Sequence, residues 1–429
     1  MKLDLDEDLK NYMYNFVERI VHEVGPRMPC SSEEAKTAEI IEEELEKSCD
    51  STTLEGFKCH PKAFLGWIKL DVIMVFSSII LYFLLNLVSN PVWKIIIAII
   101  SFLLVFLPLI IIWEEFFNYK EFIDPLFKEK ESQNTIGTFS AKGERKRIII
   151  FSSHMDTALQ FNLLKILKWG FLVLAFLGII CMLIWFIVSF INLFFVILGL
   201  FSLPAIFFDF TLTMFIIAIP CFTGLFFFVP LGDKGNVVPG AVDNLSSCSV
   251  ILGLGKYINQ NKQIIPNNTE IRLISFGCEE AGLRGSYRYV DSHREELNSH
   301  DTMVINMDGL ETPDGFHAID YEPTTRTKHS DEVIEKLIKA AKDVNISIKR
   351  FGSGKLEKTV GRLSGGSDAA AFSRADIMAG FLNSADWKAR SNYYHQSTDT
   401  PDKIKKGTLE NALKICIAFL KNEQKNNQI

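Results

Sequence analysis

The sequence predicts an α/β protein with a mixed, mostly parallel sheet, helices on both faces, and about four inserted transmembrane helices. Short apolar segments alternate with amphipathic helical segments over much of the chain, which is typical of α/β folds. Two long regions also carry almost no charged residues, which is typical of membrane helices. The chain has 429 residues, 48% of them hydrophobic. This is enough for one large soluble domain and a membrane part.

The soluble elements begin with a helix over 7–24, where apolar residues recur with helical spacing. Ser31 and Glu34 form a capping box that predicts a second helix ending near Ser48. Strands are expected over 134–138 and 147–152. The later elements are expected as helices at 244–258, 285–297, 331–344, 367–374 and 408–421, and as strands at 271–276, 302–307 and 376–382.

The first apolar region predicts a transmembrane hairpin. Residues 72–93 and 95–113 contain no charged side chain, and Asn90-Pro91 supplies a turn between them. A second uncharged region begins at Trp169. We therefore expect five segments, which alternate between a soluble α/β domain and membrane inserts: 1–65, 66–113, 114–162, 163–231 and 232–429.

Charge and cysteine content exclude some classes of function. The net charge of −6 gives no reason to expect nucleic-acid binding. The acidic N-terminus predicts no secretory signal peptide. Cys30, Cys49 and Cys59 are close enough in sequence to suggest a disulfide, but the eight scattered cysteines favour free or buried thiols.

Acidic and histidine side chains follow several predicted strands. Glu279 and Glu280 come directly after the strand 271–276. Strand ends in α/β folds are where catalytic groups gather. Zinc binds His nitrogens and carboxylate oxygens, and a pair of metals needs a bridging carboxylate. The candidate metal ligands are His154, Asp243, Glu280, Asp308 and His395.

Two further acids have candidate catalytic roles. Asp156 lies two residues after His154 and so faces the same side of a strand, where it can orient the imidazole ring. Glu279 is suited to take a proton from water and pass it to a leaving amine.

Each motif alone also has a structural explanation. The Glu279-Glu280 pair can be a charged first turn of a helix. Asp243 can be an N-cap, and Asp308-Gly309 a turn. His395 can be a buried hydrogen-bonding residue.

The order of the motifs resembles one known family. They are His154-x-Asp, Gly240-Ala-x-Asp-Asn, Glu279-Glu-x-Gly-x-x-Gly-Ser, Asn306-Met-Asp, Ser367-Asp and Tyr394-His-x-x-x-Asp-Thr. This series resembles the di-zinc aminopeptidases of peptidase clan MH, a group that includes leucyl aminopeptidase, glutamate carboxypeptidase, glutaminyl cyclase and the transferrin receptor. The resemblance covers 10–63, 130–160 and 236–421.

The resemblance implies a zinc-exopeptidase fold with two Zn²⁺ per chain and a role for each motif residue. Asp243 would bridge the two metals. His154 and Asp308 would complete one metal site, and Glu280 and His395 the other. Glu279 would act as general base and acid, with Asp156 orienting His154.

The chain departs from this family in two ways. Many relatives carry a histidine after the Ser-Asp pair, where this chain has Ala369 to Ala371, so the role of Asp368 stays open. Relatives also join the first two motifs by a short connection, whereas residues 157–242 here include membrane segments.

We therefore expect a membrane-embedded zinc metallopeptidase, most simply an aminopeptidase, that hydrolyses peptide bonds with a metal-activated water and Glu279 as base. An amidohydrolase acting on lipid-linked or N-acyl amino compounds is an alternative. So is a non-catalytic receptor or scaffold, although all five ligand residues are present. A glutaminyl-cyclase-like transferase and a transporter are weaker alternatives. The sequence leaves substrate preference and oligomeric state open.

The second insert, 163–231, should cross the membrane an even number of times. His154 precedes it and Asp243 follows it, and both must reach one site. We expect helices near Trp169–Phe190 and Pro204–Val229, with 191–203 as an interfacial or re-entrant connector. Asp209 would then lie in the first turn of the last helix.

Lysines predict which side of the membrane holds the catalytic domain. Only Lys94 lies in a loop on the opposite side. By the positive-inside rule the catalytic domain of this cell-membrane protein is expected in the cytoplasm. The lysines that flank the membrane on the catalytic side are Lys58, Lys62, Lys69, Lys120, Lys165, Lys168 and Lys234.

Overall fold

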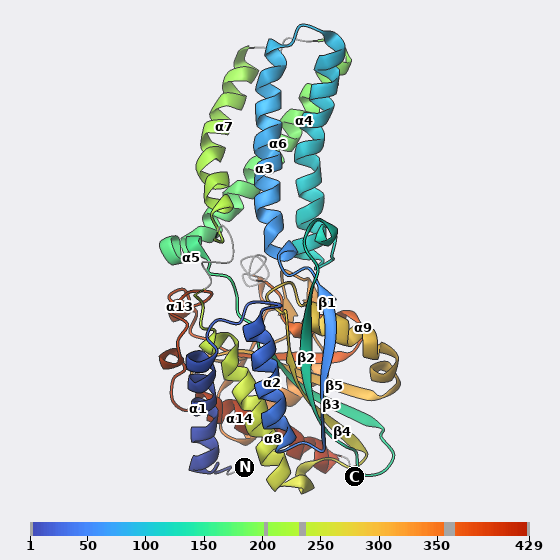
Figure 1. Cartoon of the computed structure of the whole chain (residues 1–429), viewed down its shortest axis with the longest axis vertical. Helices are drawn as coiled ribbons and strands as arrows, with labels where there is room; N and C mark the ends of the chain where they lie inside the picture. Colours follow the sequence, from blue (N-terminus) through green and yellow to red (C-terminus); the bar gives the residue numbers. More distant parts are fainter. Residues whose placement is uncertain (1–2, 201–204, 231–236, 356–364, 427–429) are drawn as a thin grey trace. The chain divides into compact units, whose positions relative to one another are not determined.

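The structure, a computed structural model, describes residues 3–200, 205–230, 237–355 and 365–426. The chain forms two compact units, each assembled from separate segments (Figure 1). Met1–Pro61, Lys128–Gln160 and Lys234–Ile429 form a sheet unit. Lys62–Phe127 and Phe161–Asp233 form a helical unit.

The sheet unit is built on an eight-stranded sheet in the order β1-β2-β4-β3-β5-β10-β6-β9. Parallel pairs join β3 to β4 and β5, β5 to β10, and β6 to β9, whereas β1–β2, β2–β4 and β6–β10 are antiparallel. The bounds are β1 (Ser51–Cys59), β2 (Lys130–Phe139), β3 (Arg147–His154), β4 (Thr269–Phe276), β5 (Asp301–Leu310), β6 (Phe316–Ile319), β9 (Ile348–Phe351) and β10 (Met378–Ser384). A separate small sheet pairs β7 (Tyr321–Glu322) with β8 (Thr327–Lys328). The mixed, mostly parallel sheet confirms the predicted fold class.

Helices cover both faces of this sheet, because strand residues alternate between two apolar cores. Along β3, Ile149 and Phe151 belong to one core and Ile148 and Ile150 to the other. The first core receives α1 (Glu7–Glu23), α2 (Ser32–Glu46), α8 (Ser246–Gln260), α10 (Asp331–Asp343) and α14 (Thr408–Asn426). The second receives α9 (Arg284–Ser299) and α12 (Asp368–Arg374). The short α13 (Trp387–Arg390) follows β10.

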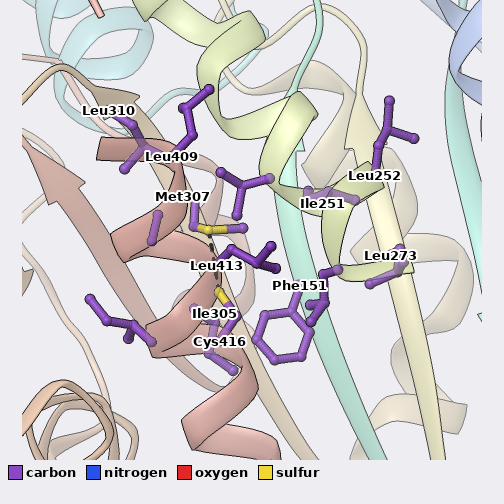
Figure 2. Close-up of a cluster of buried hydrophobic side chains, with 14 of the residues drawn as sticks. Phe151, Ile251, Leu252, Leu273, Ile305, Met307, Leu310, Leu409, Leu413 and Cys416 are labelled. Atoms are coloured by element: carbon purple, nitrogen blue, oxygen red, sulfur yellow. Dashed lines mark hydrogen bonds between the residues drawn. The ribbon is translucent and has the colours of Figure 1, made fainter. Parts of the chain in front are cut away.

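The larger core holds the middle strands in place. Leu413 and Cys416 of α14 pack toward Met307 of β5 and Phe151 of β3 (Figure 2). The Sγ of Cys416 lies 3.6 Å from the Sδ of Met307. Since all of these side chains are buried, β3 and β5 are held against a tightly packed hydrophobic core.

The sequence analysis missed the separate β7–β8 sheet and three strands that lie at or next to the edges of the large sheet. β1 pairs with β2 alone and carries mostly exposed or half-exposed residues. Its sequence, Ser51-Thr-Thr-Leu-Glu-Gly-Phe-Lys-Cys59, has too few apolar residues to be read as a buried strand. The short strands β6 and β9 occupy the opposite edge.

The helical unit contains α3 (Ala63–Leu84), α4 (Pro91–Ile111), the short α5 (Asn162–Leu167), α6 (Phe171–Ile197) and α7 (Ala205–Phe226). Within the described ranges, four helical segments are long and apolar enough to cross a membrane: Ala63–Leu87, Pro91–Phe117, Asn162–Ile197 and Asp209–Phe226. Asn90 caps α4 by accepting a hydrogen bond from the N–H of Val92, which explains the predicted turn.

Two expectations for this unit were wrong. Residues 191–197 are not a connector but the last two turns of α6, because no proline, glycine or charge interrupts the apolar run before Leu198. Asp209 lies one turn inside α7, which begins at Ala205, and its side chain is exposed. Part of the predicted connector, 201–203, and Pro204 lie outside the described residues.

The helical unit also contains polar contacts. Ser78 and Ser101 each donate a hydroxyl hydrogen bond to the other's carbonyl oxygen, at 2.7 and 2.9 Å, and so join α3 to α4. The Trp185 indole of α6 donates to the Ser78 hydroxyl at 3.2 Å. Small polar residues at such positions let membrane helices pack closely and bond to one another.

Candidate metal centre

The predicted site residues come together at the carboxyl ends of neighbouring strands. His154 is the last residue of β3, Glu279 and Glu280 follow β4, and Asp308 lies near the end of β5. Asp243 lies in the turn Ala241–Leu245 before α8, and His395 follows α13. The parallel pairing of β3 with β4 and β5 brings these ends to one edge.

Asp243 lies between the two histidines. Its Oδ1 is 3.2 Å from the Nε2 of His154, and its Oδ2 is 3.2 Å from the Nε2 of His395. The same His154 nitrogen lies 3.7 Å from Asp308 Oδ1, and the His395 nitrogen lies 3.2 Å from Glu280 Oε1. One carboxylate thus faces two separate groups of nitrogen and oxygen donors.

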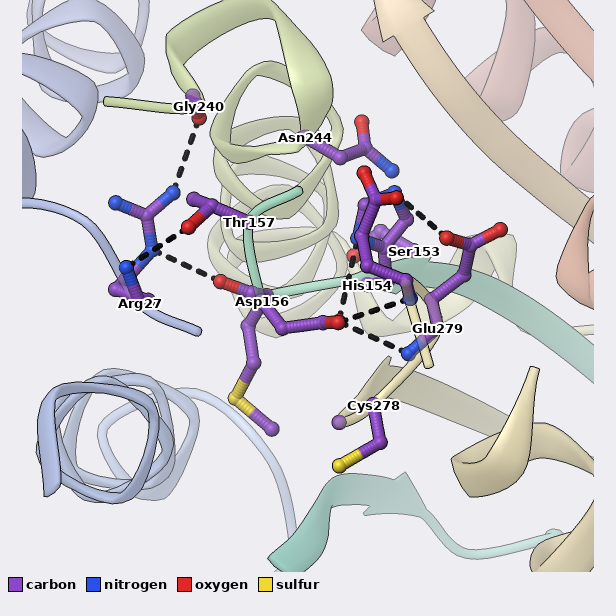
Figure 3. A network of polar contacts seen from close by, with 12 residues as sticks. Arg27, Ser153, His154, Asp156, Thr157, Gly240, Asn244, Cys278 and Glu279 are labelled. Atoms are coloured by element: carbon purple, nitrogen blue, oxygen red, sulfur yellow. Dashed lines mark hydrogen bonds and ion pairs between the residues drawn. The ribbon is translucent and has the colours of Figure 1, made fainter. Parts of the chain in front are cut away.

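Asp156 connects His154 to the two glutamates (Figure 3). Its Oδ1 accepts a hydrogen bond from the N–H of Glu279 at 3.1 Å, and its Oδ2 accepts from the N–H of Glu280 at 2.9 Å. The Nδ1 of His154 lies 3.4 Å from the same Oδ1. The carboxylate therefore sets the ring orientation and the loop position together.

Two residues that position the site received no role in the sequence analysis. The carboxylate of Asp399 accepts hydrogen bonds from the N–H groups of Val242 and Asp243, at 2.8 and 3.1 Å. The fully buried Arg27 donates to the carbonyl oxygens of Met155 and Gly240, which flank His154 and Asp243 (Figure 3). Two sequence features could have indicated them. Asp399 is the aspartate of the Tyr394-His-x-x-x-Asp-Thr motif, and Arg27 ends the sequence Gly25-Pro-Arg27 before the second helix.

The cluster shifts the pKa values of its own members in opposite directions. Burial raises the pKa of Glu279 well above its usual range, with the charges of Glu280 and Asp308 adding to the effect against His154. Burial also opposes ionisation of Asp243, but the adjacent imidazoles of His154 and His395 hold the pKa of that carboxyl well below its usual range. Glu279 thus favours a proton at the same site where Asp243 remains charged.

Both histidines favour the protonated form in the absence of metal. Burial would lower their pKa values, but the nearby carboxylates outweigh it. Glu279 and Asp156 raise the pKa of His154 well above the usual value, and Glu280 and Asp243 raise the pKa of His395 to about 9.

Asp368 lies at the start of α12, fully buried, within the electrostatic field of the site. Burial raises its pKa to about 7, and the negative charges of Asp156 and Asp308 add to this effect against His154.

The donor set fits metal ions. Two His nitrogens and several carboxylate oxygens are the ligand types that zinc takes. Within the described part of the chain, the buried Nε2 of His154 and Oδ1 of Asp308 make no hydrogen bond. Two groups have donor atoms close enough to share an ion: His154, Glu279 and Asp308, and His154, Asp243 and Glu280.

Sequence comparison finds one family model and one relative that match part of the chain. Residues 229–420 match the model of peptidase family M28. The chain is also 31% identical over 182 residues to aminopeptidase YwaD of Bacillus subtilis (strain 168), an alignment that covers 42% of this chain and only 37% of that relative. These matches confirm the predicted resemblance to this group of peptidases.

Structural comparison extends the likeness to nearly the whole chain. The zinc aminopeptidase BSAP of Bacillus subtilis superposes with a TM-score of 0.53 and 15% identity, covering 96% of this chain and 94% of that structure. A glutaminyl cyclase from an Acidobacteriales bacterium superposes with a TM-score of 0.55 and 11% identity, covering 99% of this chain and 98% of that structure. At such low identity these matches establish the fold, and not the reaction.

We predict that Asp156→Asn weakens metal binding about 10- to 100-fold while the fold is kept. The amide cannot accept from both backbone N–H groups, so the His154 ring and the glutamate loop lose their common anchor. Competition with a chelator measures the affinity. The matched control is the exposed Asp291→Asn on α9, and equal affinities for the two variants would contradict the prediction.

We predict that metal affinity falls as the pH is lowered from about 9. Below that pH His395 of the metal-free protein is protonated, so a metal must displace its proton. The apparent affinity should then change by roughly tenfold per pH unit for each proton displaced, and it should level off above the pKa of the histidines. Chelator competition at several pH values tests this. A flat profile between pH 6 and 8 would show that no proton is exchanged.

Proposed function

We propose that the protein is a membrane-embedded zinc metallopeptidase that holds two Zn²⁺ and removes residues from the amino end of peptides. The observation that carries the proposal is the position of Asp243, whose two oxygens face the two histidines at equal distances of 3.2 Å. This is the arrangement that a bridging carboxylate requires. The M28 match and the resemblance to YwaD support a peptidase over other hydrolases.

The proposed ligand sets follow the two groups around Asp243. His154 and Asp308 would hold one zinc, and Glu280 and His395 the other, with Asp243 shared. When bound, the ions would polarise the scissile carbonyl and favour deprotonation of the attacking water.

The chain's own residues carry the proton chemistry in this proposal. Glu279 takes a proton from the water that attacks the peptide carbonyl carbon. It then gives that proton to the amide nitrogen as the C–N bond breaks, so the products are an amine and a carboxylic acid, whose proton passes to the amine or to solvent at neutral pH. Its raised pKa suits both steps, because the group must hold the proton between them. Asp156 positions His154 and does not contact the substrate.

We predict that Glu279→Gln lowers kcat by about 10²–10⁴-fold or more without loss of zinc, since glutamine is similar in size but accepts no proton. Glu280→Gln is the matched variant, because it alters the neighbouring position and should lose metal as well as activity. Elemental analysis and peptide-amide hydrolysis, measured together, separate the two effects. Hydrolysis retained by Glu279→Gln would place the base elsewhere.

The same assay distinguishes the alternative reactions. Wild-type protein should bind two zinc ions at the candidate metal centre and should cleave unblocked peptides in preference to N-acylated ones. Cleavage of lipid-linked amides alone would favour the amidohydrolase alternative. Release of pyroglutamyl products would favour the glutaminyl-cyclase-like transferase alternative. Two bound zinc ions with no hydrolysis of any substrate would favour a receptor or scaffold.

We also propose that the four apolar helices span the cell membrane, with the sheet unit in the cytoplasm. The lysine distribution supports this orientation, because Lys94 is the one flanking lysine in the proposed far-side loops. The even number of candidate spans agrees with a sheet unit assembled from segments before, between and after the inserts.

We predict opposite accessibility for two exposed positions. A cysteine at Asn90, between α3 and α4, should react with a membrane-impermeant maleimide added to intact cells. A cysteine at Ser292 on α9 should react only after the membrane is opened. Both positions are exposed in the structure, so neither result can be attributed to burial. Labelling of Ser292→Cys in intact cells would reverse the orientation.

A further inference from the structure

A cluster of three thiols lies beside the candidate metal centre and has no part in it. The Sγ of Cys30 is 3.4 Å from that of Cys59 and 3.4 Å from that of Cys278, and the last two are 3.7 Å apart. Cys30 precedes α2, Cys59 ends β1, and Cys278 follows β4. Three segments that are distant in sequence thus place their sulfur atoms at one point.

The distances fit a shared metal better than a disulfide. A disulfide requires sulfur atoms about 2.05 Å apart, and it joins only two of them. In tetrahedral zinc thiolate sites the Zn–S bond is about 2.3 Å, which sets the S···S edges at about 3.8 Å. The three observed distances are nearly equal and close to this edge. The sulfur donor atoms lie near enough to one another to hold a single ion.

A buried carboxylate holds the backbone of two of the three cysteines in place. The carboxylate of the buried Glu34 accepts hydrogen bonds from the backbone N–H groups of Cys30 and Cys278, at 2.7 and 2.8 Å. It also accepts one from the hydroxyl of Ser132 at 2.8 Å. One carboxylate therefore fixes two of the three cysteine backbones, as residues behind the ligands of a metal site commonly do.

The cluster offers thiolate character and limited access. Cys59 and Cys278 are buried, whereas Cys30 is half-buried and provides the approach from solvent. Hydrogen bonds from Cys278 and Cys30 lower the pKa of Cys59, and the charges of Arg284 and Arg288 act in the same direction, whereas burial raises the pKa of Cys278 well above its usual value. The cluster therefore favours one thiolate, on Cys59, before a metal binds. The Sγ of Cys278 points away from His154 and Glu279, to the other side of the loop (Figure 3).

We propose that Cys30, Cys59 and Cys278 form a third metal site, a trithiolate that binds one Zn²⁺ separately from the proposed catalytic pair. Binding releases the thiol protons to solvent and leaves three Zn–S bonds. Because Cys278 directly precedes Glu279 and Glu280, the ion ties the loop that carries both glutamates to β1 and to the start of α2.

This site differs from the catalytic pair in a property that can be measured. The proposed catalytic ligands are nitrogen and oxygen atoms, so every metal–sulfur signal belongs to the thiol cluster. The inference does not depend on the proposed peptidase activity.

The test uses Cd²⁺ added to the metal-free, full-length protein in detergent, with thiolate-to-cadmium charge-transfer absorption as the readout. We expect the band to saturate at one Cd²⁺ per chain. It should be lost in Cys59→Ser and in the half-buried Cys30→Ser. It should persist in Cys49→Ser, a matched half-buried cysteine outside the cluster, and in Asp243→Asn, which alters only the proposed catalytic pair.

Several outcomes would overturn the inference. They are absence of the band in wild-type protein, a band that survives both Cys30→Ser and Cys59→Ser, and a Cys30–Cys59 disulfide in the protein as isolated. If Cys59→Ser fails to fold, X-ray absorption at the zinc edge of wild-type protein decides the matter. A sulfur shell near 2.3 Å is expected, and a shell of nitrogen and oxygen alone would exclude the site.

Discussion

Buried negative charge at one edge of the sheet is the constraint on which the site depends. Asp156, Asp243, Glu279, Glu280 and Asp308 converge at the ends of three adjacent strands, where they are largely removed from water. A buried charge without a partner costs several kcal/mol. Two histidines and the backbone N–H groups around Asp156 offset part of this cost. Divalent cations would offset the rest, so metal binding and the integrity of this edge are coupled.

The same crowding of charges gives carboxyl groups of similar chemistry different protonation states. Asp243 lies between two imidazoles and keeps its charge, whereas Glu279 has fewer positive neighbours and favours its proton. Environments that push the pKa values of neighbouring carboxyl groups apart are typical of acid–base catalysis. The fold achieves this through backbone contacts made by Asp156 and Asp399, which fix the positions of both acids.

The sequence predicted the parts of the molecule that local pattern determines. The apolar runs indicated the buried strands β3 and β4, and Ser31 does cap α2, since it accepts from the N–H of Glu34 at 3.1 Å. The side chain of Glu34 behaves differently from the capping-box expectation. It reaches the N–H groups of Cys30 and Cys278, and the second of these is 244 positions away. No local pattern contains that contact.

The dependence on contacts between distant segments also explains why other features were not predicted from the sequence. The site residues could be named in advance because six motifs occur in family order, but their supporting contacts could not, because Arg27 and Asp399 act through backbone atoms of distant segments. Edge strands such as β1 bury too little to leave a periodic pattern. The extent of α6 depended on residues 191–197, where apolar composition alone fits a helix or a connector equally well.

The order of segments along the chain has a consequence for biosynthesis. β3, in the middle of the sheet, is translated before residues 161–233 of the helical unit, and its two neighbours β4 and β5 only afterwards. In the proposed membrane topology, an apolar strand must therefore wait unpaired while α6 and α7 enter the bilayer. Such exposed edges favour aggregation. In that topology, nascent chains should depend on a chaperone, or on slow emergence of Arg147–His154 from the ribosome, until α6 and α7 have entered the bilayer.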